Sequence, residues 1–134
     1  MQPTTIAENK SHMWFEELPE RCPPTDAKIP SGQEYFRLIE NGSIESDDFI
    51  SHRKIWPNKA FNVSECRARS VSVYSGIEEC RAIKKLPMHK KKKIAKVILN
   101  QGDGYIKQTG QNKEHYSWWR TQSFNYETST ALVA

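Results

Sequence analysis

Four polar side chains in this sequence have the types and spacing that could act on a phosphate ester. Arg37 lies in a predicted strand, His52 and Arg53 are adjacent in the segment 51–54, and His115 opens an aromatic segment. Two imidazoles can cleave RNA without a metal, one taking the 2′-hydroxyl proton and the other protonating the leaving oxygen. A guanidinium can hold the phosphate. Arg37, His52, Arg53 and His115 are therefore the candidate catalytic residues.

A block of positive charge at residues 81–96 is the second feature that bears on function. It holds eight lysines and arginines in sixteen positions and no acid. Such a block attracts anions, and neutralised phosphates release counterions, so it predicts salt-dependent binding of nucleic acid or another polyanion. The alternatives are a solvated loop, a nuclear address or a site for an acidic protein. The predicted binding residues are Lys90, Lys91, Lys92, Lys93, Lys96, Arg67, Arg69, Lys107, Trp118 and Arg120.

The segment that carries His115 is rich in aromatic residues. Trp118 and Trp119 are adjacent, so in a strand they point to opposite faces of the sheet. One ring can fill the core while the other is exposed beside Arg120, where it could stack a nucleic-acid base for roughly 1–3 kcal/mol per base. The alternative is that the second ring packs beneath an aromatic pair near the N-terminus.

Residues 1–32 are predicted to form an extended, acidic and proline-rich arm. Its four prolines between residues 19 and 30 remove backbone donors and favour extended geometry. Trp14 and Phe15 would anchor this arm to the body of the protein or dock it onto a protein partner. The acids of the first third could also fold back onto the basic block.

The composition of the 134-residue chain bounds the class of protein. Four tryptophans, five tyrosines and five phenylalanines are enough for a small core, which excludes full disorder. No apolar run approaches 18 residues, so no membrane span and no membrane partner are expected. The net charge of +4 hides a split, since residues 1–50 carry 4 positive and 10 negative side chains, whereas residues 51–134 carry 16 and 6. The body of the protein is therefore more basic than the mean.

The three cysteines, Cys22, Cys66 and Cys80, are widely spaced and form no Cys-x-x-Cys pair. This pattern predicts reduced thiols in the cytoplasm, with Cys80 in the core, and it offers no metal site. The N-terminus lacks the basic start and apolar stretch of a secretory signal, which also favours a cytoplasmic location. No glycine-rich phosphate loop or other cofactor motif occurs, so no cofactor is expected.

A small α+β domain at residues 33–125 has to position these side chains, as a mostly antiparallel sheet with one or two short helices. Alternating apolar residues predict strands at residues 33–40, 93–100, 105–109 and 115–122 and at the end of residues 65–73. The three strands at residues 93–122 are predicted to form an antiparallel meander. A short helix is predicted after Ser46, and a capping box of Ser75 and Glu78 predicts a helix to about residue 85. Residues 126–134 are predicted to be a loose tail.

Several segments resemble known proteins. The runs WFEELPERCPP, EYFRLIE, DDFISHRKIWPNKAF, ECRARSVSV and GYIKQTG with HYSWW are similar to a group of small uncharacterised bacterial proteins, over about residues 14–120. That resemblance implies no activity. The chain also resembles, more weakly, proteins of the ADP-ribosyltransferase-like fold, which implies that Arg37 on an early strand and a serine on a later strand surround a nicotinamide nucleotide. The chain departs from that family at its late catalytic glutamate, for which Glu114 and Glu127 are poor counterparts.

The leading prediction is a small binding module for an anionic partner, with nucleic acid first. The second hypothesis is an RNA- or nucleotide-directed enzyme, either a metal-free ribonuclease or ADP-ribosyltransferase-like. The third is a protein-interaction adaptor in a larger bacterial or mobile-element assembly. One spatial expectation separates them, because only the enzyme requires Arg37, His52 and His115 to meet at one ligand.

Overall fold

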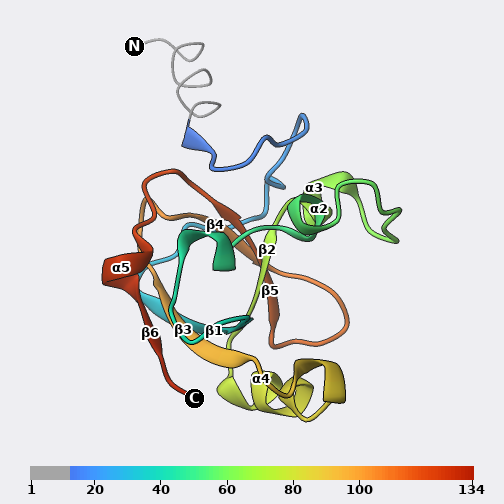
Figure 1. The fold of residues 1–134 in the computed structure, drawn as a ribbon. Coiled ribbons are helices and arrows are strands. Elements are labelled where there is room, and N and C mark those ends of the chain that lie inside the picture. Colours follow the sequence, from blue (N-terminus) through green and yellow to red (C-terminus); the bar gives the residue numbers. More distant parts are fainter. Residues whose placement is uncertain (1–12) are drawn as a thin grey trace.

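Six antiparallel strands form one sheet at the centre of the computed structural model, which describes residues 13–134 (Figure 1). The strands lie in the order β4-β5-β2-β1-β3-β6, and short helices surround them, so the fold is a small α+β domain, as predicted. The strands are β1 (Gln33–Ile39), β2 (Val71–Tyr74), β3 (Lys93–Leu99), β4 (Gly104–Gln108), β5 (His115–Arg120) and β6 (Thr130–Leu132). The helices are η1 (Ser46–Asp48), α2 (His52–Ile55), α3 (Glu65–Ala68), α4 (Ile77–Lys84), η2 (Pro87–His89) and α5 (Tyr126–Ser129).

Successive side chains along β2 point alternately into the core and to a polar face of the sheet. Val71 and Val73 are buried in the core, so Ser72 and Tyr74 point to the opposite face. β5 pairs with β2 in a register that sets Ser72 opposite Ser117 and Tyr74 opposite His115. Since residues directly opposite each other share a face, these four polar side chains lie together.

Aromatic rings fill the core between the sheet and the segments that cover it. The rings of Phe49, Trp118 and Phe124 meet edge to face, with centroids 4.7 to 6.4 Å apart. Trp118 and Trp119 are both fully buried, at 0% and 1% exposure, although they point to opposite faces. Each indole N–H is satisfied, because Trp118 donates to the Asp103 carbonyl and Trp119 to the Cys66 carbonyl. Both faces of β5 are therefore covered.

Two predicted helix starts differ in detail. α4 begins as expected, but its N-cap is Gly76, and the Ser75 hydroxyl donates to Glu114 on the segment before β5 instead of capping the helix. Glu78 pairs with Arg81 on the next turn of α4. The helix predicted after Ser46 is divided into η1 and α2, because the extended residues between them let Ser51 cap α2 through the Lys54 amide.

Two other predictions about the strands were wrong. The strands β3, β4 and β5 form no meander: β4 and β5 are a hairpin, but β3 pairs with β1 and β6 at the other side of the sheet. Residues 126–134 are not loose, because they form α5 and then β6, which pairs with β3. Short local signals cannot reveal such pairing between strands far apart in the chain.

The proline-rich arm lies along the β4 side of the sheet. Its residue Lys28 bridges Ile106 in β4, and Trp14 bridges Thr121 just after β5. The remainder of the predicted arm, residues 1–12, lies outside the described residues. Within residues 13–134, no helix has the length and apolar character needed to cross a bilayer.

Candidate functional site

The sheet opens between β1 and β2, and a cleft occupies the opening. These strands are joined at one residue pair, Phe36 and Tyr74, whereas β1 pairs with β3 along its whole length. The connection from β1 to β2 carries η1, α2 and α3 and contributes to the walls of the cleft. The cleft has a larger hollow of about 530 Å³ and a smaller one of about 160 Å³. His52 and Ser72 line both hollows, so the two adjoin.

A hydrogen-bonded chain of Ser72, His115 and Thr109 forms one wall of the cleft. The Ser72 hydroxyl lies 3.1 Å from Nε2 of His115, while Nδ1 lies 3.2 Å from the carbonyl and 3.0 Å from the hydroxyl of Thr109. Because a carbonyl only accepts, Nδ1 carries the proton, and in the neutral ring Nε2 accepts from Ser72. Desolvation lowers the pKa of His115, the bond to the Thr109 carbonyl opposes this in part, and the charge of nearby Arg67 lowers the pKa as well. The ring is therefore a neutral base at pH 7.

Arg37 lies at the floor of the cleft, between the two strands that separate. Its guanidinium donates to three backbone carbonyls, those of Asp48 at 2.6 Å, Ser72 at 2.7 Å and Ile50 at 3.2 Å. It forms no ion pair with any described carboxylate. Desolvation lowers the pKa of Arg37, which nonetheless stays charged. The side chain therefore holds the η1–α2 segment onto β2 and leaves a positive charge beneath the cleft.

His52 stands at the junction of the two hollows. Its ring stacks on Phe61 with centroids 6.3 Å apart and planes 21° from parallel. Partial desolvation lowers the pKa of His52, and the positive charge of Arg37 acts in the same direction. His52 is thus a second neutral imidazole in the cleft at pH 7.

The remaining lining includes a cation, an indole, a polar atom without a partner and, in the larger hollow, the carboxylates of Glu40, Asp47 and Asp48. Arg67 lines the smaller hollow and has no ion pair among the described residues. Trp56 lines the larger hollow with 56% of its surface exposed. Nδ1 of His89, at the edge of the same hollow, is buried and has no hydrogen-bond partner in the described part of the chain. The smaller hollow, which holds Arg67 and no described carboxylate, would suit a negatively charged group, and Trp56 would suit a planar ring in the larger one.

Three of the four candidate catalytic residues, Arg37, His52 and His115, line this cleft. Arg53 does not line it. Its guanidinium is bidentate to Glu65, with N···O distances of 2.9 and 3.0 Å, and also donates to the carbonyls of Pro57 and Lys59. Those bonds hold the α2–α3 loop, so the role of Arg53 is structural.

The predicted binding residues are distributed over the fold. Lys92 pairs with Glu40 and Lys96 with Glu34, both on the β1 side, while Lys107 pairs with Asp26 beside β4. Arg69 is bound to Glu65 and to the Glu17 carbonyl. Lys90, Lys91 and Lys93 remain exposed.

Trp118 and Arg120 are not available for a ligand, contrary to the prediction. Trp118 is in the core, and Arg120 is 7% exposed, with its guanidinium donating to the Ser46 and Phe49 carbonyls. The Phe15 ring covers Arg120, with the guanidinium carbon 3.6 Å from the ring centroid, and Trp14 contacts the Tyr105 ring. The aromatic pair of the arm therefore packs on the body of the protein, which is one of the two roles predicted for it; the other was docking onto a protein partner.

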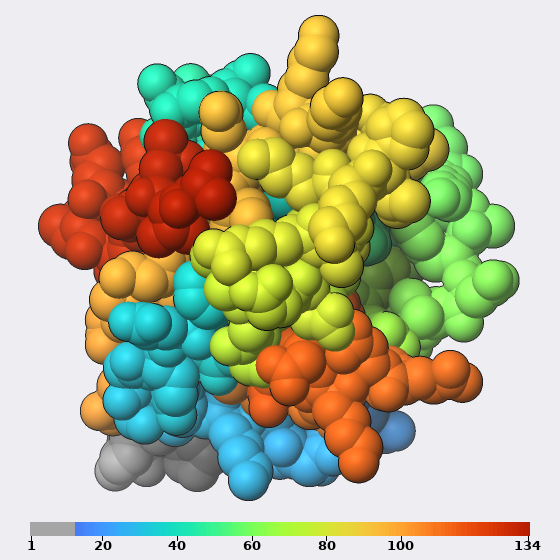
Figure 2. All heavy atoms as spheres, turned by 90° about the horizontal axis from the view of Figure 1, so that it is seen from below, coloured from blue at the N-terminus to red at the C-terminus, as the bar shows by residue number. Residues whose placement is uncertain are grey.

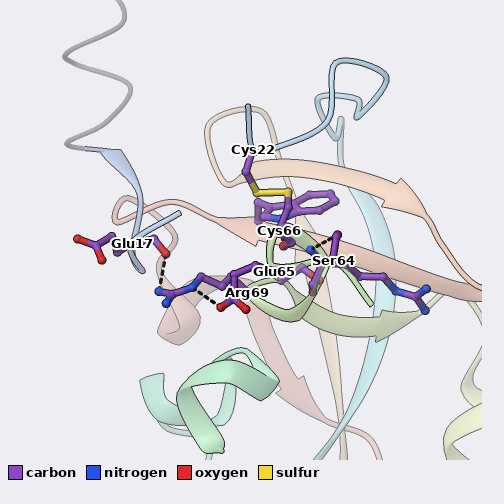
Figure 3. The surroundings of a disulfide bond; sticks show 9 residues. Glu17, Cys22, Ser64, Glu65, Cys66 and Arg69 are labelled. Carbon is purple, nitrogen blue, oxygen red and sulfur yellow. Dashed lines mark hydrogen bonds and ion pairs between the residues drawn. A yellow bond between two sulfur atoms is a disulfide. The ribbon is translucent and has the colours of Figure 1, made fainter. Parts of the chain in front are cut away.

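The expectation of three reduced thiols was wrong, because Cys22 and Cys66 form a disulfide (Figure 3). The bond joins the arm to α3, beside the contact between Arg69 and the Glu17 carbonyl. Ser64 caps α3 by accepting from the Arg67 amide, and Trp119 donates to the Cys66 carbonyl. α3, which carries Arg67 into the cleft, is thus fixed on several sides. Cys80 is buried in the core, as predicted, and its burial raises its pKa to about 11.

The sequence patterns singled out neither Ser72 nor Trp56, and they favoured a surface position for His89; the resemblance implied a serine on a later strand but not which one. The alternation in β2 contained the signal for Ser72, because Val71 and Val73 reserve one face for the core and leave the serine on the other. Trp56 and His89 lie in short connections, and nothing in their local pattern separates a cleft residue from a surface residue.

A metal centre has no support in the described part of the chain, where no group of three or more His, Cys, Asp and Glu side chains lies close enough to hold an ion. In comparisons with known proteins, no family model, no curated protein and no solved structure matches the chain. Only the cleft itself therefore bears on function.

Proposed function

We propose that the protein is a nucleotide-directed enzyme of the ADP-ribosyltransferase-like kind, which binds a nicotinamide dinucleotide in the cleft and breaks the bond between its nicotinamide and ribose. The observation that carries the proposal is that Arg37 on β1, Ser72 on β2 and His115 on β5 meet where the sheet opens. An arginine on an early strand and a serine on a later strand around one pocket is the arrangement that the resemblance implies.

The lining of the cleft suits a dinucleotide. A volume of about 530 Å³ is in the range of cofactor pockets, and the smaller hollow adds room for a second group. Arg67 supplies a guanidinium for the pyrophosphate, supported by the buried charge of Arg37. Trp56 offers an exposed ring for a base.

The chemistry of the bond fits a site with neutral bases and no metal. When the bond between C1′ of the ribose and the nicotinamide nitrogen breaks, its electron pair goes to the nicotinamide, which leaves as a neutral molecule. A hydroxyl group attacks C1′ and forms the new C1′–O bond. The proton of that hydroxyl passes by way of the Ser72 hydroxyl to Nε2 of His115.

A metal-free ribonuclease is less well supported by the same residues. That mechanism needs one imidazole protonated as the general acid, but the pKa values of His52 and His115 are both lowered. Both ring nitrogens of His115 are also occupied within the protein, by Ser72 and Thr109. Glu114 and Glu127 do not line the cleft, since Glu114 accepts from Ser75 and Glu127 lies at the start of α5.

The test is to incubate the purified protein with NAD⁺ and to measure nicotinamide release by liquid chromatography. We expect release by the wild type and a loss of at least a hundredfold in Ser72→Ala, with Ser43→Ala, an exposed serine outside the cleft, as the matched control. Saturation transfer difference NMR with NAD⁺ gives an independent measure of binding. The absence of both binding and release in the wild type would overturn the proposal.

A further inference from the structure

A third hollow, of about 320 Å³, lies on the surface beside the C-terminal half of α4. It is lined by Arg81, Lys84, Lys85 and Lys90 together with Ile94 and Ala134. We call this hollow and the adjoining Lys91 and Lys93 the lysine surface. Figure 2 shows α4 (yellow-green) and the residues that follow it (yellow to amber) projecting as a continuous part of this face.

Most charges of the lysine surface have no ion-pair partner among the described residues. Lys84, Lys85, Lys90, Lys91 and Lys93 form no ion pair with any described residue, whereas their neighbours Lys92 and Lys96 are paired with Glu40 and Glu34. Arg81 alone on this surface is paired, with Glu78. Five unpaired ammonium groups close together repel one another and raise the local positive potential, so the surface attracts a ligand with several negative charges.

The acidic arm does not cover this surface within the described residues. Residues 13–32 run along β4 and the end of β5, as the bridges of Lys28 and Trp14 show. In Figure 1 the arm lies at the end of the sheet away from α4. The lysine surface therefore stays open to a partner.

Neighbouring residues of one segment line the cleft and the lysine surface. α4 and the segment after it contribute to both sites. The larger hollow of the cleft is lined by Ile83, His89 and Lys92. The hollow of the lysine surface is lined by Lys84, Lys85 and Lys90. His89, whose Nδ1 has no hydrogen-bond partner in the described structure, directly precedes Lys90 in the chain. A flexible polyanion bound on the lysines can thus place one of its groups in the cleft.

We infer that the partner on the lysine surface is a nucleic-acid strand, which serves as the acceptor for the ADP-ribosyl group; this inference rests on the proposed function. A strand presents phosphates at regular intervals to the lysines, and its hydroxyl or base groups reach the cleft. In the transfer, the C1′–nicotinamide bond breaks, a bond forms between C1′ and an oxygen or nitrogen of the strand, and the strand loses one proton to His115. An anionic membrane is the competing partner, but only Leu86 and Met88 are exposed apolar residues on this segment.

The binding experiment measures fluorescence anisotropy of labelled single-stranded RNA and DNA oligonucleotides at about 50 mM and about 200 mM salt. Binding that depends on phosphate contacts weakens strongly between these two concentrations. The variant Lys90→Gln, Lys91→Gln, Lys93→Gln removes three charges from the lysine surface. The matched control, Lys28→Gln, Lys54→Gln, Lys113→Gln, removes three exposed charges elsewhere. We expect binding at least tenfold weaker in the first variant and within about twofold of wild type in the control, with the salt slope reduced by about 2 in the first variant alone.

Each other outcome has a definite meaning. Equal losses in both variants would show that only net charge matters, and they would overturn the inference. The same would follow if the wild type failed to bind either oligonucleotide at low salt, or if it bound phosphatidylserine vesicles in place of nucleic acid. Nicotinamide release to water without any oligonucleotide reports on the proposed function separately. Transfer is tested with an oligonucleotide and NAD⁺ that carries a label in its adenylate group. If the oligonucleotide has acquired no label after incubation, it is not the acceptor and the inference is overturned.

Discussion

At the scale of single residues, Ser72 and His115 are the pair on which the proposed function depends. Their contact is made across two neighbouring strands, and Thr109 fixes the imidazole from its other side. Replacing Ser72 with alanine removes only the hydroxyl, because the backbone carbonyl that binds Arg37 remains. We therefore expect Ser72→Ala to lower kcat by at least a hundredfold and to change the free energy of unfolding by less than about 1 kcal/mol, measured by urea denaturation. A parallel loss of stability would instead assign Ser72 a structural role.

The pH dependence of the reaction should report on the imidazole. Because burial and Arg67 lower the pKa of His115, its Nε2 is unprotonated at pH 7 and becomes protonated only at more acidic pH than an ordinary imidazole. The rate of nicotinamide release should be flat between pH 7 and pH 8 and should fall as the pH drops below the lowered pKa. The decisive comparison is with His115→Ala, whose residual rate should lose this acidic limb. A limb that persists in the variant would point to His52 instead.

At the scale of elements, the start of β4 shows how tightly the hairpin with β5 is packed. Gly104 has a φ of 135°, and a β-carbon built there would overlap the carbonyl oxygen of Trp119. Gly104→Ala should therefore destabilise the protein by more than about 2 kcal/mol, seen as a lower midpoint in thermal or urea unfolding. Gly42→Ala is the matched control, since its β-carbon would meet nothing within 4 Å and its φ is unstrained. Comparable losses in the two variants would contradict the packing argument.

Local sequence patterns were sufficient for the position of several elements and insufficient for their pairing. Alternation predicts β1 and β3 within a residue of their observed bounds, and the α4 helix is found where its apolar stripe predicts it. The pattern could not reveal that β3 joins β1 and β6, since both partners are far away in the chain. The opening between β1 and β2 was also beyond reach, because it depends on Arg37 replacing strand pairing with bonds from its side chain.

The same limit explains which site residues could be predicted. Arg37, His52 and His115 were recognised by residue type alone, and the fold happens to bring all three to one cleft. Arg53 and Trp118 have equally suitable types, but a carboxylate holds the first and the core encloses the second. Residue type identifies candidates, whereas burial and hydrogen-bond partners select among them.

At the scale of the whole molecule, the disulfide between Cys22 and Cys66 ties the arm to the body across 44 positions of sequence. Closing a loop of that length restricts the unfolded chain, so Cys22→Ser should lower the free energy of unfolding by roughly 4 kcal/mol in the loop-entropy account. Urea denaturation with and without dithiothreitol measures the effect. The reductant should destabilise the wild type by a similar amount and leave Cys22→Ser unchanged. An unchanged wild type under reduction would contradict this account.

The buried position of Cys80 has a consequence for how the oxidised protein is obtained. A chain with three cysteines has three ways to form one disulfide, and thiolates are the species that exchange. Once the core has formed, the raised pKa of Cys80, about 11, and its complete burial remove it from exchange. Oxidation of the folded, reduced protein should therefore yield a single isomer, whereas oxidation in denaturant yields a mixture. Peptide mapping after alkylation distinguishes the two, and the order of folding before oxidation decides which product a preparation contains.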